Sequence, residues 1–454
     1  MTEGRETPVR PIRVAVFGHV GQDNLGDEAA FKAVIEAAKS RRPSAEIIGV
    51  SVNPEETAVR YGIRTFPIWR DTPSSGHRSE ESTKAHRQER VQPVSSAEGA
   101  GRLKGFLRRV PGLFSLLRSV VHVFALVPVV MRESLFLWQT YRMLRQVDLL
   151  AVAGSQHLND YVLGPWNFPY TLFKWTILAK FGGAKVAFLN VGAGPLQTTL
   201  GKWFIRQAVI WSDFQSYRDE SSVRCIKELG VQAVRPSLPD MVFSLCPERQ
   251  PSAVDAIEAN LVVGINPIPF NSADYWVGGS QENYERYIHV MASFARWVLD
   301  RGCKVVFFPT QLTLDPLVIR DMLAQIDVNL FEQGRVAEAS IKSIEDLSAA
   351  IASMDIVVAS RFHGLIFSML HEKPVLGIAY AEKTRDLMTY MGQADHVLGI
   401  LELNLSEMQR RFCEIESNRE QIAATLCRKK HDCRQAVEAE FDEAFSLLGT
   451  VAVH

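Results

Sequence analysis

The chain has 454 residues, of which 47% are hydrophobic and 22% are charged, as in a globular protein with room for two or three domains. Its 50 Lys and Arg residues balance 51 Asp and Glu residues, so the overall charge does not indicate nucleic-acid binding. The six cysteines form no CxxC pair, which argues against a disulfide framework and favours reduced thiols in a cytoplasmic protein.

Strands and helices alternate along the first half of the sequence. Residues 12–17 (IRVAVF) predict a buried strand, and a glycine-containing loop and a helical pattern follow it. The alternation continues through strand-like runs at 147–153 and 185–191, with a helical segment between them. Short apolar runs separated by amphipathic helices are typical of a parallel α/β sheet. We therefore expect an N-terminal Rossmann-like domain over residues 12–250, after a flexible N-terminus at 1–11.

This domain contains an insertion at about 70–145. Residues 71–100 are rich in Ser, Glu, Arg and Gln, a composition that predicts disorder. The segment 113–131 is strongly apolar and follows a basic stretch at 102–109, but it is short for a bilayer span. Two interpretations remain open: a buried helix, or a peripheral membrane contact through 102–131. The N-terminal residues show no apolar core of a signal peptide, so none is expected.

A second α/β series begins after a composition break near 246–260. Its strand-like runs include LVVGINP, KVVFFPT, DIVVAS and PVLGIAY. We expect a C-terminal Rossmann-like domain over 251–400, and helices over 401–454. The predicted fold is thus α/β, with two doubly wound domains facing a cleft. Ligands of such sheets bind beyond the carboxyl ends of the strands.

The loop after the first strand, FGHVGQDNLGDEAAF, combines glycines with a helix start, where free N–H groups can hold an anion. Its spacing is not that of a dinucleotide-binding motif. We assign Asn24, Gly26 and Asp27, together with Lys383, to binding of an anionic donor substrate. Alternatively, Asn24 and Asp27 are only turn and capping residues.

Cationic side chains follow several predicted strands. Arg361 and His363 come directly after the buried run DIVVA, and the planar guanidinium of arginine matches phosphate or carboxylate. Arg218 stands in QSYRDESS, and Lys383 follows the strand PVLGIAY. The alternatives are structural ion pairs for the arginines and a satisfied core histidine. The sequence contains no HExxH motif or other cluster of metal ligands, and no GKS/T phosphate-binding motif. A small, multiply charged anion is therefore the simplest ligand.

Four blocks in order, NLGDEA, VGAGPL, YRDESSVRCIKELGV…LPD and SRFHGLIFSMLHEKPVLGIAYAEKTRDLM, resemble the polysaccharide pyruvyl transferase family over residues 12–392. The resemblance implies a glycosyltransferase-B-like pair of domains. It also implies transfer of the pyruvyl group of phosphoenolpyruvate to two sugar hydroxyls as a cyclic ketal, with no cofactor beyond this donor. Arg361 and His363 match the family's Arg-x-His, and Arg218 matches the arginine of its RD…S motif, which makes these three the expected catalytic residues.

Many relatives have a GGG stretch where this chain has Ser155, Gln156 and His157. His157 is a candidate for the acceptor side, and Asp240 and Asp27 are candidates for the hydroxyl's base. The expected role is exopolysaccharide or cell-surface glycan biosynthesis in the cytoplasm, or peripherally at the inner face of the membrane, on a saccharide that is free or lipid-linked. Two alternatives stay open: a nucleotide-sugar-dependent glycosyltransferase of the same fold class, and a catalytically inactive carbohydrate-binding relative.

Overall fold

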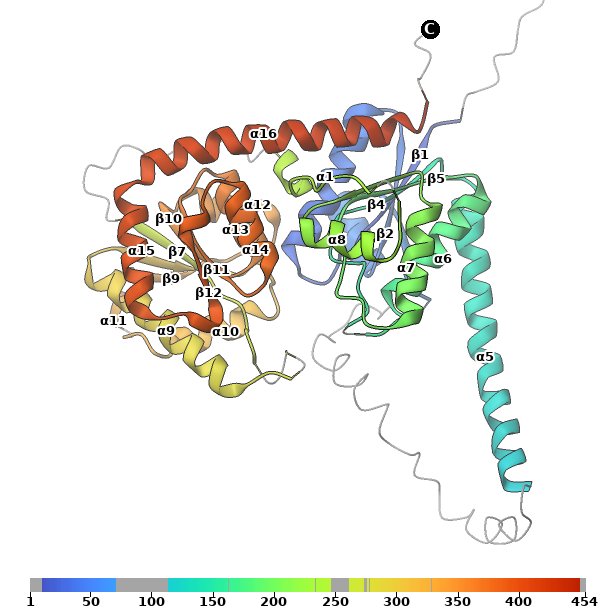
Figure 1. The fold of residues 1–454 in the computed structure, drawn as a ribbon, viewed down its shortest axis with the longest axis horizontal. Coiled ribbons are helices and arrows are strands. Elements are labelled where there is room, and N and C mark those ends of the chain that lie inside the picture. Colours follow the sequence, from blue (N-terminus) through green and yellow to red (C-terminus); the bar gives the residue numbers. More distant parts are fainter. Residues whose placement is uncertain are drawn as a thin grey trace, which may run out of the picture.

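The computed structural model describes residues 10–70 and 113–449, apart from 162, 233, 246–260, 273–275, 277 and 328. The expected disorder at 71–100, the basic stretch at 102–109 and nearly all of the expected flexible N-terminus lie outside these residues. Two parallel six-stranded sheets dominate the described part (Figure 1). Each is covered by helices on both faces, as expected for doubly wound domains.

The first sheet has the strand order β3-β2-β1-β4-β5-β6. Its strands are β1 (Arg13–Phe17), β2 (Glu46–Ser51), β3 (Arg64–Pro67), β4 (Leu149–Val152), β5 (Lys185–Val191) and β6 (Phe214–Tyr217). Its helices are α1 (Leu25–Arg41), α2 (Pro54–Tyr61), α5 (Leu113–Leu144), α6 (Phe168–Gly182), α7 (Thr199–Trp211) and α8 (Glu220–Glu228), and the short helix η2 (Met241–Ser244) follows them.

The second sheet has the order β12-β11-β10-β7-β8-β9, which is the same winding as the first. Its strands are β7 (Val262–Asn266), β8 (Lys304–Phe307), β9 (Val336–Glu338), β10 (Ile356–Ala359), β11 (Val375–Ala379) and β12 (Val397–Gly399). Its helices are α9 (Gln281–Asp300), α10 (Asp315–Leu323), α11 (Asn329–Glu332), α12 (Ile344–Ala352), α13 (Phe362–Leu370), α14 (Glu382–Tyr390), η3 (Ala394–His396) and η4 (Ile400–Glu402). In each sheet the order reverses beside the first strand, between β1 and β4 and between β10 and β7.

Side chains on β1 alternate between two cores. Val14 and Val16 point to the face covered by α1, and their core continues into the second domain. Ala15 and Phe17 point to the opposite face, where α5, α6 and α7 supply residues such as Phe136, Trp175 and Ile205. A strand buried on both faces explains the uninterrupted apolar run of the sequence.

Two helices after the second sheet, α15 (Leu405–Ser417) and α16 (Arg419–Ser446), complete the described fold. Helix α16 crosses both domains (Figure 1). Leu426, Val437 and Phe441 lie buried along its length, and Arg41 of α1 pairs with Glu438 and Asp442. The chain therefore returns to the first domain at its C-terminal end.

Helix α5 begins away from the domain, and its C-terminal part runs beside α6 (Figure 1). Pro128 lies inside it without ending it. Val129, Val130 and Met131 are exposed, so a buried helix does not describe this part of the segment. Among the described residues, no helix combines the length and the apolar character that crossing a bilayer requires.

Candidate active site

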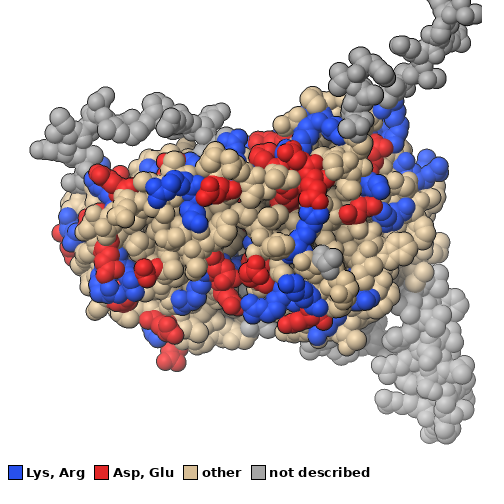
Figure 2. All heavy atoms as spheres, turned by 45° about the horizontal axis from the view of Figure 1, so that its top comes forward, with Lys and Arg blue, Asp and Glu red and all other residues tan. Residues whose placement is uncertain are grey.

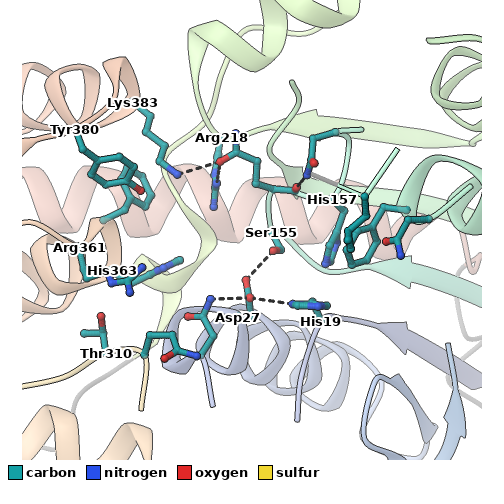
Figure 3. Close-up of a pocket in the computed structure, with 18 of the residues that line it drawn as sticks. His19, Asp27, Ser155, His157, Arg218, Thr310, Arg361, His363, Tyr380 and Lys383 are labelled. Atoms are coloured by element: carbon teal, nitrogen blue, oxygen red, sulfur yellow. Dashed lines mark hydrogen bonds and ion pairs between the residues drawn. The ribbon is translucent and has the colours of Figure 1, made fainter. Parts of the chain in front are cut away.

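The loops at the carboxyl ends of both sheets enclose a cavity of ≈ 330 Å³ between the domains (Figure 3). The first domain contributes the loops after β1, β4 and β6, and the second contributes those after β8, β10 and β11. The two halves touch directly, since the Leu25 amide donates to the Thr310 carbonyl at 2.9 Å and the Leu312 amide donates to the Asp23 carbonyl at 2.8 Å. The cavity is therefore built by both domains, at the edge predicted for ligand binding.

Asp27 is the centre of a polar network on the first-domain side. Its Oδ1 accepts from the Ser155 hydroxyl at 2.6 Å, and its Oδ2 accepts from the Asn24 amide at 2.9 Å and lies 3.5 Å from His19 Nδ1. Burial raises the pKa of Asp27, but its interactions with His19 and the hydrogen bond from Ser155 outweigh burial and leave the pKa well below its usual range. The carboxylate is thus ionised, and it is aimed at His19.

Asn24 is a capping residue that also lies in the cavity wall. Its side-chain oxygen accepts from the Gly26 amide and caps α1, while its side-chain amide donates to Asp27. It also lines the cavity. Capping and site construction therefore coincide at this residue.

His157 is buried against the same side. Its ring stacks on Phe168 with centroids 5.0 Å apart, and neither ring nitrogen has a hydrogen-bond partner among the described residues. Burial, reinforced by repulsion from His19, lowers the pKa of His157 to about 3, so the ring is neutral near pH 7. A neutral imidazole has one donor and one acceptor, and among the described residues both are buried without a partner beside the cavity.

Arg361 lies on the second-domain side, at the start of α13. Its Nε donates to Asp315 Oδ1 at 2.9 Å, and its Nη2 donates to the same oxygen. Asp315 is fully buried and also accepts from the backbone amides of Thr310 and Gln311. One edge of the guanidinium is therefore fixed, while Nη1 has no protein partner among the described residues. Arg361 thus forms a structural ion pair and also lines the cavity.

His363 projects from the first turn of α13 toward the first domain. Its Nε2 lies 3.9 Å from Asp240 Oδ2, and its Nδ1 would be only 1.9 Å from a Cβ atom placed on Gly26. Any side chain at position 26 would collide with the imidazole, which explains the glycine. Burial lowers the pKa of His363, and the nearby Asp240 carboxylate opposes this shift.

Arg218 follows β6 and is almost completely buried. Its nitrogens lie 3.6 Å from Asp219, 3.7 Å from Asp240 and 3.4 Å from Gln156 Oε1, and its guanidinium carbon lies 5.2 Å from the Phe362 ring centroid. Its Nε has no hydrogen-bond partner among the described residues. Asp219 is mainly the cap of α8, because it accepts from the Ser222 amide at 2.7 Å.

Lys383 reaches across from α14. Its Nζ donates to Gln156 Oε1 at 2.9 Å and lies near the rings of Phe362 and Tyr380. Burial raises the pKa of Tyr380, but the charges of Lys383 and Arg361 outweigh it and lower the pKa overall. The direction of this shift reflects the positive charges at this end of the cavity.

The structure brings together every residue selected from the sequence. Ten labelled side chains converge in Figure 3, with Arg361, His363, Lys383, Tyr380 and Thr310 from the second domain facing His19, Asp27, Ser155 and His157 from the first. Gly26 leaves room for the His363 ring, and the Asp240 carboxylate lies beside it. His19, Ser155, Gln156 and Tyr380 were not selected, although the position of His19 directly after β1 was an available signal. Among the described residues, no group of His, Cys, Asp and Glu side chains is arranged to hold a metal ion.

Comparison with solved structures finds the same architecture. The UDP-GlcNAc 2-epimerase from Methanocaldococcus jannaschii superposes with a TM-score of 0.51 at 8% identity, covering 89% of this chain and 92% of that one. The UDP-GlcNAc 2-epimerase from Neisseria meningitidis, bound to UDP-GlcNAc, gives 0.52 at 11% identity, with 95% and 99% covered. At such identities the likeness shows the fold alone: two Rossmann-like domains of the glycosyltransferase-B-like type. No curated protein is similar enough in sequence to serve as a relative.

A sequence model of one family, described as polysaccharide pyruvyl transferase, matches residues 24–382. The match spans most of the chain and includes Asn24, Gly26, Asp27, Arg218, Arg361 and His363. It begins in the loop after β1 and ends in the first turn of α14, so it takes in both sides of the cavity. The chain belongs to the polysaccharide pyruvyl transferase family, and it is a transferase.

Proposed function

We propose that the cavity binds phosphoenolpyruvate and transfers its pyruvyl group to two hydroxyls of a saccharide as a cyclic ketal. The observation that carries this proposal is the gathering of Arg361, Lys383, Arg218 and His363 at one end of the cavity, where the pKa of Tyr380 is lowered. Phosphoenolpyruvate carries a phosphate and a carboxylate on one small skeleton. Arginine side chains suit both groups, and several cations in one small cavity suit a ligand with more than one negative charge.

The reaction needs two hydroxyl protons to be moved. A proton adds to the methylene carbon of the donor, the first hydroxyl oxygen bonds to the neighbouring carbon, and a base takes that hydroxyl's proton. Phosphate then leaves, and the second hydroxyl closes the ketal. Its proton goes to the phosphate, so the balance is one ketal and one hydrogen phosphate from one donor and one diol.

His363 is the residue we assign to proton delivery, either to the methylene carbon or to the phosphate. Its imidazole lies among Arg218, Lys383 and Asp240, where both donor and phosphate charge develop. Arg361 and Arg218 neutralise the donor and stabilise the departing phosphate. Asp315 holds Arg361 in place, and Gln156 joins Arg218 to Lys383 across the domains.

His19 is the residue we assign as the base for the acceptor hydroxyl. His19 lines the cavity, and its Nδ1 lies 3.5 Å from the ionised Asp27, which orients the ring. Asp27 itself is a weak base because its pKa is low. In this assignment Asp27 serves the acceptor side as a positioning residue rather than binding the anionic donor, since two negative charges repel each other.

The remaining parts of the proposal concern the setting. We place the reaction in exopolysaccharide or cell-surface glycan biosynthesis, with an acceptor saccharide that is lipid-linked. A cytoplasmic protein at the inner face of the membrane meets both the donor and such an acceptor. Chemistry at the cavity requires no cofactor beyond the donor.

Calorimetric titration of donors tests the proposal. Phosphoenolpyruvate is expected to bind the wild-type protein, and Arg361→Lys is expected to weaken binding by about tenfold or more because the ammonium group cannot reproduce the bidentate fork. Lys383→Ala should weaken binding as well, whereas Arg385→Ala, an exposed position on the same helix, should leave it unchanged. Binding of UDP- or GDP-sugars in place of phosphoenolpyruvate would make the protein a glycosyltransferase, and binding of a glycan alone would make it an inactive carbohydrate-binding relative.

A further inference from the structure

Exposed apolar side chains are concentrated on one side of the first domain. Among the described residues, every large hydrophobic side chain that is exposed belongs to α5, α6, α7 or the loop before α6, except Val59, Tyr390 and Leu401. The three helices pack together on one face of the first sheet, opposite the face that meets α1 and α16. Their outer side, here called the α5–α7 face, therefore points away from the second domain.

The exposed residues follow the outer stripe of each helix. On α5 they include Leu135 and Trp138, and on α7 they are Leu200, Trp203, Ile210 and Trp211. Half of the chain's eight tryptophans are exposed here: Trp138, Trp166, Trp203 and Trp211. A soluble helix normally turns such a stripe inward, so an outward stripe on neighbouring helices indicates an interaction surface.

The charge of these helices is one-sided. Glu133 is the only acidic residue in their sequences, against seven Lys or Arg residues, although the whole chain has a formal net charge of −1. Glu133 is itself neutralised, because Lys174 lies 2.9 Å away. The opposite surface differs: Figure 2 shows Lys and Arg interspersed with Asp and Glu over the side that α16 crosses. Tryptophan with basic residues and almost no acid matches an anionic lipid surface.

The apolar surface continues to the mouth of the cavity. Leu163 is half exposed and also lines the cavity, and Trp166, which is two-thirds exposed, belongs to the same loop. Trp166 contacts Phe204 of α7, with ring centroids 5.6 Å apart. A lipid bilayer that touched the α5–α7 face would therefore place its headgroups near the cavity entrance.

We propose that the α5–α7 face docks on an anionic lipid bilayer and lies in its interface without crossing it. The cavity then opens beside the headgroups, so that the acceptor is a glycan carried on a membrane lipid; this second part rests on the proposed function. A second copy of the chain is the weaker candidate occupant, because a twofold contact would set the same basic helices against each other.

Vesicle flotation tests the docking with two matched pairs of variants. Trp211 and Tyr390 each end a helix, α7 and α14, and are 45% and 46% exposed. Leu135 and Leu401 are 58% and 55% exposed. Wild-type protein should float with phosphatidylcholine vesicles that contain about one-third phosphatidylglycerol, and less with phosphatidylcholine alone. Trp211→Asp and Leu135→Asp should each reduce flotation by about tenfold, while Tyr390→Asp and Leu401→Asp should not.

Two further measurements separate the explanations. Phosphate release from phosphoenolpyruvate with a short water-soluble glycan should be equal in all four variants, because none of these positions lines the cavity. Loss of flotation without loss of this activity supports the proposal. Wild-type protein that is active but does not float would overturn the docking alone, whereas floating protein without phosphate release would overturn the proposed function alone. A dimer in light scattering that both Trp211→Asp and Leu135→Asp dissociate would assign the face to a second copy and overturn the proposal.

Discussion

The two sides of the cavity have opposite chemistry although they come from sheets of the same winding. The second domain contributes three cationic or cation-capable side chains, Arg361, His363 and Lys383, whereas the first contributes a carboxylate bonded to neutral donors and two further histidines. Arg218 is the exception, because it leaves the first sheet at β6 and turns toward the second domain. In the proposed function, the same topology thus supplies an anion-binding group of side chains on one side and an acid–base group on the other, and the difference lies in single residues after the strands.

Among the changes considered, removing the imidazole of His363 from the second-domain side should lower kcat the most. His363→Ala is expected to lower kcat by about a thousandfold, because proton delivery and part of the positive field are lost together. Steady-state phosphate release measures it. The matched control is His371→Ala, since His371 ends the same helix and bonds Ser348 outside the cavity. Full activity of His363→Ala would remove this residue from the mechanism.

The contact between the two sides can be broken from the first domain without touching a charge. Gly26→Ala should lower kcat by about a hundredfold or more, because its Cβ would lie 1.9 Å from His363 Nδ1 and force the ring away. In a His363→Ala background the same change should cost almost nothing, since the collision partner is gone. Additive losses in this double-mutant cycle would show that Gly26 acts through something other than His363.

Changes on the first-domain side should separate turnover from donor binding. His19→Asn is expected to lower kcat by about a hundredfold while leaving the calorimetric affinity for phosphoenolpyruvate unchanged, because the base acts on the acceptor. Asp27→Asn should act in the same direction through the orientation of His19. Equal weakening of donor binding by either change would mean that the donor occupies both sides, and the comparison between them would fail.

The smallest expected effect is on the stability of the folded protein, through helix α16, and it depends on pH. Burial, with repulsion from Asp240 adding to it, raises the pKa of Glu440 on α16 from 4.5 to about 7, and Ser216 bonds its Oε1. Between these values the folded protein keeps a proton that the unfolded chain has released, so stability falls as pH rises from 4.5 to 7. The difference is at most about 3 kcal/mol.

Glu440→Gln removes this titration and keeps an acceptor for Ser216. Its gain in melting temperature over the wild type should be small at pH 5 and should reach a plateau above pH 7, as measured by circular dichroism. Glu420→Gln, an exposed position on the same helix, is the control and should show no such pH dependence. A gain that is equal at pH 5 and pH 8 would exclude Glu440 as the titrating group.

Much of the second-domain side was predictable because local sequence carries it. A buried run such as DIVVA ends in a parallel sheet at the edge where loops gather, so Arg361 and His363 had to lie there. The fold class followed from the same alternation and is confirmed by the two sheets. The Arg361–Asp315 pair could not be predicted, because it joins residues that only the packing of β8 beside β7 and β7 beside β10 brings together.

The first-domain side was harder to read from sequence. His19 stands between Gly18 and Val20, and its significance comes from Asp27 in the first turn of the following helix and from Ser155 after β4. In the sequence, His157 stands out only because it departs from the family's glycine pattern. Its burial against Phe168 and its unpartnered nitrogens depend on a loop conformation that spacing does not encode.

Helix α16 has a mechanical consequence. Because it begins against the second domain and ends against the first, where Arg41 pairs with Glu438 and Asp442, the domains are linked at two places in the chain. Two bodies joined twice form a closed linkage rather than a free hinge, so opening the cavity must bend α16 or slide it over α1. In the proposed reaction, a bulky glycan would therefore reach the cavity only as α16 allows, and shortening the C-terminus would loosen the contact between the domains without changing a cavity residue.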